Sequence, residues 1–283
     1  MNHEKNLNLN MNQSEKGKDK VYQLKSFILF LTCGLLIFVV PIFIRDIIRI
    51  IYFIALPLVF LIVSIILYKN TQQNKFLPVF FAFFIASLVF FLQTPWVSGT
   101  TIENIVLNML ISTLIIVVPI ILLTKISKNN ISSLYLQKGN TRLGIIIGLV
   151  TFSIFLLTAL PAAVFIFGGQ NIPFDRLIDL SPWILTFVFL NAIREEILFR
   201  GLFLKKYDTF LGGDTSNVLQ AIIFSLAHLS AQITPFTFIY LILSFFLGFA
   251  FGGVIQKTDS LLGAILFHAG ADFPVIIAVF SFL

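Results

Sequence analysis

The chain has 283 residues, of which 58% are hydrophobic and only 11% are charged, and its mean hydropathy is +0.99. This composition excludes a soluble globular domain and is typical of a polytopic helical membrane protein. The net charge of +6 does not indicate nucleic-acid binding, because most Lys and Arg residues lie in the first 25 residues and in short loops. The single cysteine, Cys33, excludes a disulfide framework and a thiolate zinc site. The heavy use of Phe, Ile and Lys suggests a bacterial source with an AT-rich genome.

The chain begins with a polar segment and continues as a series of apolar runs. Residues 1–26 are rich in Asn and Lys and predict a disordered cytoplasmic tail. The following runs are long enough, or nearly so, to cross ~30 Å of hydrocarbon. They predict an all-α, polytopic transmembrane bundle of eight to nine spans, because the seventh run is the shortest. The runs lie at about 27–44, 47–67, 76–95, 105–124, 143–167, 182–204, 216–231, 235–255 and 260–282.

The distribution of basic residues predicts how the bundle is oriented. With nine spans, alternate loops and the N-terminal tail contain nearly all of the lysines, whereas the other loops contain only Arg45, Arg49 and Arg176. Because Lys and Arg accumulate on the cytoplasmic side, this asymmetry predicts a cytoplasmic N-terminus and an external C-terminus. We expect the protein to lie in the cell membrane in contact with lipid.

Two parts of the membrane region differ in their polar content. Residues 27–180 form N-terminal transmembrane helices without a chemical motif, whereas residues 181–283 contain an intramembrane cluster of ionisable residues. The pairs Gly144/Gly148 and Gly248/Gly252 have the spacing at which helix backbones approach closely.

Three ionisable residues, Glu195, Glu196 and Arg200, lie within a single apolar run. Each costs about 2.5–3.5 kcal/mol near the membrane centre, so the cluster predicts a wet internal cavity. Glu195 lies ~15 Å from the end of its span, and His228 and His268 lie at ~16 Å and ~13 Å along theirs. Three helices therefore bring ionisable groups to nearly one level.

The spacing of these residues indicates which of them share a helix face. Glu196 and Arg200 have the i, i+4 spacing of an intrahelical ion pair, while Glu195 points ~100° away toward another helix. Phe224 shares a face with His228, and His268 shares one with Asp272. A Glu and a His from different helices can activate water, and a second His can stabilise an oxyanion.

Structural roles are open for the same residues. Glu196 and Arg200 alone would more often hold helices together, and an intramembrane His is often an interhelical hydrogen-bonding group. Asp272 could simply hold His268 in one tautomer. Arg194 is an additional positive charge beside the cluster and is assigned no role. These readings leave the common depth of the three motifs unexplained.

These motifs resemble those of the CPBP family of intramembrane proteases, which includes type II CAAX prenyl endopeptidases and bacteriocin-processing or self-immunity homologues. The family pattern is EExxxR, FxxxH and HxxxN on successive helices. This chain has Glu195, Glu196 and Arg200 for the first, Phe224 and His228 for the second, and His268 with Asp272 for the third. The resemblance covers about residues 180–283, so 181–283 is predicted to be the catalytic core.

The resemblance implies a role for each matched residue. Glu195 with His228 would activate water, His268 with Asp272 would form the oxyanion hole, and the remaining matched residues, Glu196, Arg200 and Phe224, would support the site. Asp272 stands where the family more often has Asn, and an ionised Asp cannot donate to an oxyanion. It must then be protonated or orient His268. A metal-free mechanism without cofactors is favoured, and the alternative is a zinc ion (Zn2+) bound by His228, His268 and Glu195.

The expected function is an intramembrane endopeptidase that cleaves a membrane-associated peptide or protein in the cytoplasmic half of the bilayer. Candidate substrates are a bacteriocin precursor or a signalling-peptide precursor. A non-proteolytic membrane scaffold or regulator of the same fold is one alternative. A proton-coupled transporter is another, but the sequence lacks the inverted repeats or broken helices typical of that class.

Overall fold

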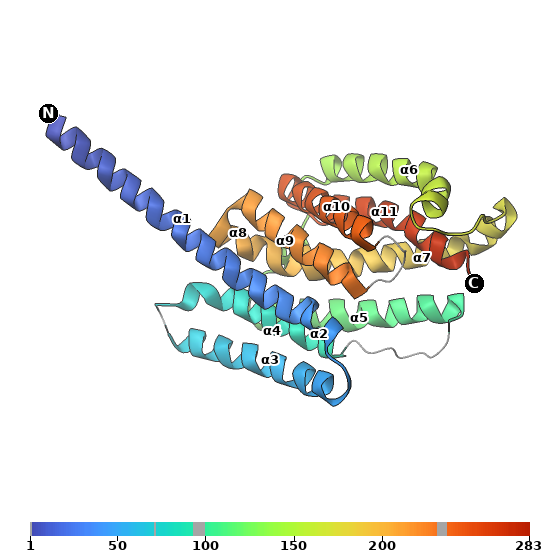
Figure 1. Cartoon of the computed structure of the whole chain (residues 1–283), viewed down its shortest axis with the longest axis horizontal. Helices are drawn as coiled ribbons and strands as arrows, with labels where there is room; N and C mark the ends of the chain where they lie inside the picture. The colour runs from blue at the N-terminus through green and yellow to red at the C-terminus, as the bar shows by residue number, and fades with distance from the viewer. Residues whose placement is uncertain (1, 71, 93–99, 231–236) are drawn as a thin grey trace.

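The computed structural model describes residues 2–70, 72–92, 100–230 and 237–283, and this part of the chain is helical without β-strands. The predicted all-α class is confirmed. Its long helices run along one direction (Figure 1). The elements are α1 (Asn2–Phe38), α2 (Val40–Phe43), α3 (Asp46–Lys69), η1 (Asn74–Phe76), α4 (Leu77–Leu92), α5 (Ile102–Ile126), η2 (Ile131–Leu134), α6 (Thr141–Phe165), α7 (Phe174–Glu195), η3 (Glu196–Leu204), α8 (Lys205–Leu211), α9 (Gly213–Ala227), η4 (His228–Ser230), α10 (Thr237–Thr258) and α11 (Leu262–Phe280).

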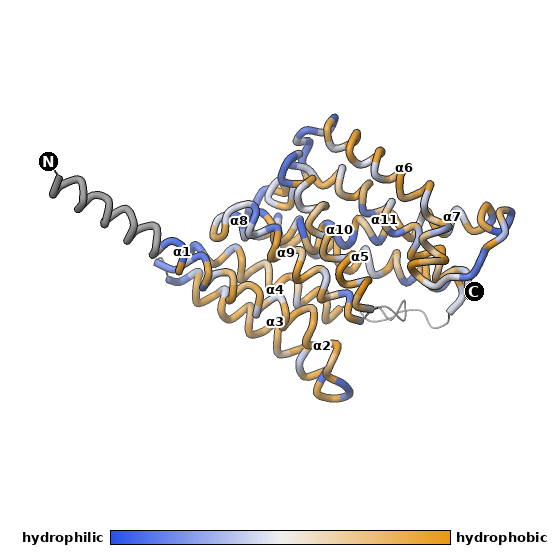
Figure 2. The backbone as a smooth tube through the Cα atoms, turned by 45° about the horizontal axis from the view of Figure 1, so that its top comes forward, coloured by the Kyte–Doolittle hydropathy of each residue, from blue (hydrophilic) through white to orange (hydrophobic). Residues whose placement is uncertain are grey.

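Within the described ranges, eight helical segments are long and apolar enough to cross a membrane. Hydrophobic residues run along these helices, and hydrophilic residues gather at their ends (Figure 2). The seventh predicted run corresponds to α9, which has 15 residues and falls short of a full span. The eight membrane-spanning segments therefore agree with the lower end of the predicted eight to nine spans. Residues 93–95, 231 and 235–236 of the predicted spans lie outside the described residues.

Helix α1 begins at Asn2, so the structure has helix where the sequence predicts a disordered tail over residues 1–26. Tyr22 gives a physical reason for order near the end of this segment. Its ring lies 6.5 Å from the rings of Phe76 and Phe210, and the ammonium of Lys75 lies 4.4 Å from its centroid. Packing against the bundle thus stabilises the helix from this point onward.

Short contacts define one end of the bundle, which we call the Lys-rich end. Lys205 forms an ion pair with Asp259 at 3.5 Å and lies over the ring of Tyr135. The Tyr135 hydroxyl donates to Asp208, and burial, followed by the charges of Asp208 and Asp259, raises the pKa of this phenol. These contacts join the loop before α6, helix α8 and the α10–α11 turn. The opposite end contains the turn between α2 and α3.

Helices α9 and α10 form an antiparallel pair that begins and ends at the Lys-rich end. Gln256 donates to the Gly213 carbonyl, Asn217 to the Phe249 carbonyl and Ser225 to the Leu241 carbonyl. Residue numbers thus rise along α9 as they fall along α10. Helix α9 therefore completes the alternation of chain direction although it is too short to count as a span.

Helices α6 and α11 pack with their backbones in close approach. A Cβ atom added to Gly263 would lie 2.7 Å from the Gly144 carbonyl oxygen, and one added to Gly148 would lie 2.7 Å from Leu266 Cβ. The close approach predicted from Gly144/Gly148 is confirmed. This packing sets the position of α11, which contains two of the predicted site residues.

Candidate active site

The polar cluster lies where an α-helix widens into a π-helix. Helix α7 continues directly into η3, a nine-residue π-helix, and every residue of η3 is buried. π-Helical turns are rare and occur often at functional sites. Because η3 is enclosed on all sides, its polar residues must find partners within the protein.

Glu196 and Arg200 form the predicted ion pair inside η3. Arg200 Nη1 donates to Glu196 Oε1 at 3.0 Å, and Nη2 donates to the Gly248 carbonyl at 3.1 Å. Both side chains have an exposed fraction of 0%. The guanidinium also lies 4.0 Å from the ring centroid of Phe224. Because Arg200 contacts Gly248 of α10 and Phe224 of α9, the pair holds η3 against these two helices. Removing one partner of such a buried ion pair typically lowers the free energy of unfolding by about 3–5 kcal/mol.

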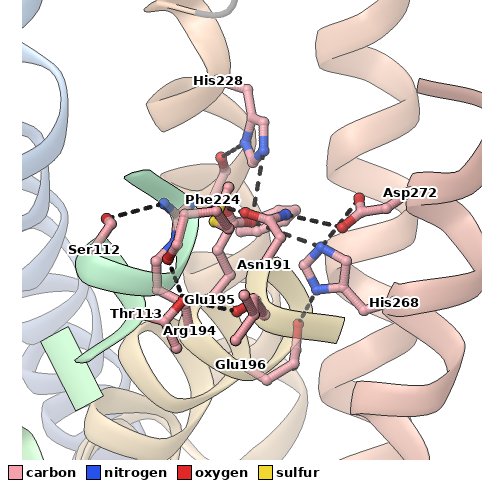
Figure 3. Close-up of polar contacts among 12 residues, drawn as sticks. Ser112, Thr113, Asn191, Arg194, Glu195, Glu196, Phe224, His228, His268 and Asp272 are labelled. Atoms are coloured by element: carbon pink, nitrogen blue, oxygen red, sulfur yellow. Dashed lines mark hydrogen bonds and ion pairs between the residues drawn. The ribbon is translucent and has the colours of Figure 1, made fainter. Parts of the chain in front are cut away.

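The two carboxylate oxygens of Glu195 have different surroundings. Oε1 accepts a hydrogen bond from Arg194 Nη2 at 2.8 Å. Oε2 is buried and has no hydrogen-bond partner among the described residues. It lies 3.8 Å from His228 Nε2 and 3.6 Å from His268 Nε2 (Figure 3). One free oxygen thus faces both imidazoles.

His228 lies at the end of α9, where the helix gives way to η4. Its Nδ1 is 2.7 Å from the Phe224 carbonyl oxygen. The Phe224 ring packs on that of His228 with centroids 4.5 Å apart, and the same ring contacts the Arg200 guanidinium. These contacts orient Nε2 toward Glu195.

His268 on α11 is held by a carboxylate and an aromatic ring. Its Nδ1 is 2.7 Å from Glu196 Oε1, the same oxygen that accepts from Arg200. The ring of Phe251 stacks on the imidazole with centroids 4.6 Å apart. The second nitrogen, Nε2, is therefore directed to Glu195 and to Asp272, whose Oδ1 lies at 3.6 Å.

A chain of hydrogen bonds joins Asp272 to Glu195. Asn191 Nδ2 donates to Asp272 Oδ2 at 2.9 Å, and Asn191 Oδ1 accepts from Arg194 Nη2 at 2.6 Å. Arg194 also donates to Ser112 on α5 at 3.3 Å. The chain connects α5, α7 and α11 through polar atoms (Figure 3).

The structure brings all the predicted site residues together. The three residues that the sequence analysis did not assign are Asn191, Arg194 and Phe251. The first two are one helical turn apart on α7, and this i, i+3 spacing next to Glu195 is the signal that could have identified them. Nothing in the sequence distinguishes Phe251 from the other aromatic residues of α10.

Two cavities meet at His228. One has a volume of about 540 Å³ and is lined by Arg194, Glu195 and His228 together with residues of α1, α2 and α3. The other has a volume of about 270 Å³ and is lined by His228, His268 and Asp272 among mainly apolar residues of α6, α10 and α11. We call them the polar cavity and the apolar cavity. His228 therefore borders both cavities.

The predicted zinc ligands can be tested against this geometry. The Nε2 atoms of His228 and His268 and Oε2 of Glu195 are donor types that zinc accepts. However, no group of three His, Cys, Asp or Glu side chains in the described part of the chain is arranged to hold a metal ion. The metal-free mechanism and the zinc alternative both remain predictions, and the steps proposed for hydrolysis use only side chains of the protein.

Residues 178–274 match the family model described as type II CAAX prenyl endopeptidase Rce1-like. The matched segment contains every predicted site residue and also Asn191, Arg194 and Phe251. The match confirms the resemblance inferred from the motifs. Comparisons with curated proteins and with solved structures give no match.

Proposed function

From the premise that residues 178–274 form a domain of the type II CAAX prenyl endopeptidase family, we propose that the protein is a membrane-embedded endopeptidase using water activated by Glu195 and His228. The family is one of proteases, and the apolar helices make this a multi-pass membrane protein. The substrate we propose is a peptide or protein associated with the membrane.

The observation that carries this proposal is the position of Glu195 Oε2. This oxygen is buried, lacks a hydrogen-bond partner among the described residues and lies 3.8 Å from His228 Nε2. A water molecule about 2.8 Å from each atom can bridge a pair at that separation. Glu196 Oε2 is also buried without a hydrogen-bond partner, so the feature that distinguishes Glu195 among the described residues is the position of its Oε2 beside the Nε2 atoms of both His228 and His268.

The protonation of His228 follows from its partner. A backbone carbonyl only accepts hydrogen bonds, so Nδ1 of His228 must donate to the Phe224 oxygen. In the neutral ring, Nε2 is then an acceptor and can receive a hydrogen bond from water. Glu195 and His228 thereby orient the lone pair of the water oxygen toward a substrate carbonyl.

His268 is suited to stabilise the oxyanion. Its Nδ1 donates to Glu196, so Nε2 carries a proton when the ring is an imidazolium. The carboxylates of Glu196 and Asp272 beside the ring balance that positive charge. A charged donor in a site with little water stabilises a developing oxyanion strongly.

The steps of hydrolysis follow from these positions. Glu195 takes a proton from water as the water oxygen bonds to the carbonyl carbon, and His268 stabilises the oxyanion that forms. The C–N bond then breaks as the carbonyl re-forms. The leaving nitrogen receives the proton held by Glu195, which yields one new carboxyl group and one new amine.

The test is cleavage of a panel of membrane-associated peptide precursors by the purified full-length protein in lipid nanodiscs. Glu195→Gln and His228→Ala should each lower the rate by about 10²–10⁴-fold, because each removes a group that positions or deprotonates water. Glu103→Gln is the matched control, since Glu103 is an exposed acid in the first turn of α5. Thermal unfolding establishes that each variant is folded.

Three outcomes would contradict the proposal. Cleavage unchanged in folded Glu195→Gln would exclude Glu195 as the base. Loss of cleavage with a chelator and recovery with zinc would replace the metal-free mechanism by the zinc alternative. No cleavage by the wild type, together with biological function retained by Glu195→Gln, would favour a non-proteolytic scaffold.

A further inference from the structure

Arg194 lies beside the proposed base, and the steps proposed for hydrolysis give it no role. Its guanidinium donates through Nη2 to Glu195 Oε1 at 2.8 Å and to Asn191 Oδ1 at 2.6 Å, and through Nη1 to Ser112 at 3.3 Å. The exposed fraction is 15% for the Arg194 side chain and 11% for that of Glu195. Charge-assisted hydrogen bonds of this kind are short and strong. Partners on two helices, α5 and α7, therefore hold the guanidinium in place.

The contact with Arg194 determines which oxygen of Glu195 faces the imidazoles. The last torsion of a Glu side chain is broad, so a carboxylate held at neither oxygen can turn about it. Arg194 occupies Oε1, and Oε2 is the oxygen that lies 3.8 Å from His228 Nε2 and 3.6 Å from His268 Nε2. A proton taken from water then goes to Oε2, because Oε1 already accepts from Arg194.

Arg194 also determines how Asn191 is oriented. A guanidinium only donates hydrogen bonds, so the atom of Asn191 that faces Arg194 must be the amide oxygen. The amide nitrogen then faces Asp272 and donates to its Oδ2 at 2.9 Å. Residue 272 must therefore offer an acceptor to Asn191, and a carboxylate does so with either oxygen. The Arg194–Asn191 pair thus matches the Asp at this position.

These contacts form a closed ring of side chains in the site (Figure 3). From Asn191 the ring continues through Asp272, whose Oδ1 lies 3.6 Å from His268 Nε2. The same nitrogen lies 3.6 Å from Glu195 Oε2, and Arg194 joins Glu195 back to Asn191. The proposed base and the proposed oxyanion donor are thereby held in one network.

Helix α5 supports this network from outside the segment that matches the protease family. Ser112 accepts from Arg194, and its neighbour Thr113 donates to the Leu190 carbonyl of α7 at 3.2 Å. Both residues lie before residue 178, where the family match begins. The N-terminal helices therefore contribute to the position of Arg194.

We propose that Arg194 is a positioning residue for hydrolysis, which keeps Oε2 of Glu195 directed toward the water that Glu195 and His228 activate. Ser112 and Asn191 in turn hold Arg194. This inference rests on the proposed peptidase function. Arg194 acts through Glu195, so its removal should affect turnover and leave substrate binding unchanged. A role only in joining α5, α7 and α11 is the alternative, and it would affect stability without moving the Glu195 carboxylate.

The kinetic test measures cleavage by the full-length protein in lipid nanodiscs. Arg194→Gln should lower kcat about 10–100-fold and leave KM within about twofold, because the contact matters only when water is positioned and deprotonated. Arg194→Lys should lose less, since an ammonium can still donate to Glu195 but lacks the fork that reaches all three partners. Ser112→Ala should lower kcat by about twofold to fivefold. Arg176→Gln is the matched control, because Arg176 is an exposed Arg in the first turn of α7.

Infrared spectroscopy tests the position of the Glu195 carboxylate without cleavage. The band of this carboxylate is the one that is missing from the spectrum of Glu195→Gln. The frequency of a carboxylate depends on the hydrogen bonds that its oxygens accept. The band should therefore shift in Arg194→Gln and stay in place in Arg176→Gln.

Two results would overturn the proposal. They are an unshifted Glu195 band in folded Arg194→Gln, and a raised KM at unchanged kcat, which would mean that Arg194 binds substrate. If thermal unfolding shows that Arg194→Gln does not fold, Arg194→Lys decides, and wild-type values for both its kcat and its Glu195 band would overturn the proposal. Absence of cleavage by the wild type would contradict the peptidase function, whereas the infrared band reports on Arg194 independently, so the two failures are distinguishable.

Discussion

Asp272 is the residue at which this site departs most clearly from the family pattern. Its Oδ2 accepts from Asn191, and its Oδ1 lies 3.6 Å from His268 Nε2. A carboxylate in this position accepts hydrogen bonds and balances charge, whereas an amide could also donate to an oxyanion. The contact with Asn191 favours the orienting role among the two roles considered for Asp272.

We therefore expect Asp272→Asn to keep cleavage within about tenfold of wild type, whereas Asp272→Leu should lower it by about 100-fold or more. The Asn oxygen can still accept from Asn191, and its amide can donate to the oxyanion; Leu can do neither. The measurement is the turnover number for one cleaved precursor, with unfolding temperature as the control. A loss in Asp272→Asn as large as that in Asp272→Leu would mean that the negative charge itself is required.

Among the site residues, charged side chains are easier to identify from the sequence than neutral ones. An ionisable group in an apolar run is costly to insert into a bilayer, so its presence there indicates a structural or functional role. This argument identified Glu195, Glu196, Arg200 and His268. Asn191 carries no charge, so its cost in the bilayer is lower and its signal is weak. Its importance depends on contacts with Arg194 and Asp272 that only the folded chain brings together.

Among the helices, η3 is the element whose form the sequence could not predict. The segment Glu196–Leu204 is apolar on nearly every side, so its periodicity cannot distinguish a π-helix from an α-helix. The shortness of α9 could be predicted, because the seventh apolar run is the shortest in the sequence and α9 has only 15 residues. Gly144 and Gly148 predicted a close approach of helix backbones, because glycine spacing limits how closely helices can pack, and the structure shows that α11 is the partner.

The α6–α11 contact leads to a prediction about stability. Gly263→Ala should destabilise the protein by about 1–3 kcal/mol, because the added Cβ would lie 2.7 Å from the Gly144 carbonyl oxygen and would push the helices apart. Gly253→Ala is the control, since its added Cβ would meet only Asn217 Nδ2 at 3.9 Å. The free energy of unfolding in detergent, measured by denaturant titration, compares the two. Equal stability of the variants would contradict close backbone packing here.

The whole molecule alternates in chain direction between the Lys-rich end and the end that contains the α2–α3 turn. The predicted orientation places the Lys-rich end in the cytoplasm. The polar cavity is lined by α2 and by Arg49 and Phe53 of α3, so it extends toward the other end. A cytoplasmic N-terminus and a site entered from the cytoplasm are therefore separate predictions, and the orientation needs its own measurement.

Labelling with a membrane-impermeant thiol reagent tests the orientation. In a Cys33→Ser background, Lys138→Cys should react only after cells are opened, whereas Gln170→Cys should react in intact cells. Both positions are exposed, and they lie before and after α6, which spans the bundle. The reverse pattern would place the N-terminus outside.

The extension of the polar cavity toward the α2–α3 turn has a consequence for where the products would go. If the predicted orientation holds, a substrate reaching Glu195 by this route comes from the outer leaflet, and the fragment cut from it is released to the exterior. The protein would then act as a sheddase or as a late step in peptide export. Its activity would be detectable as peptides accumulating in the culture medium, and the cytoplasm would contain no matching fragment.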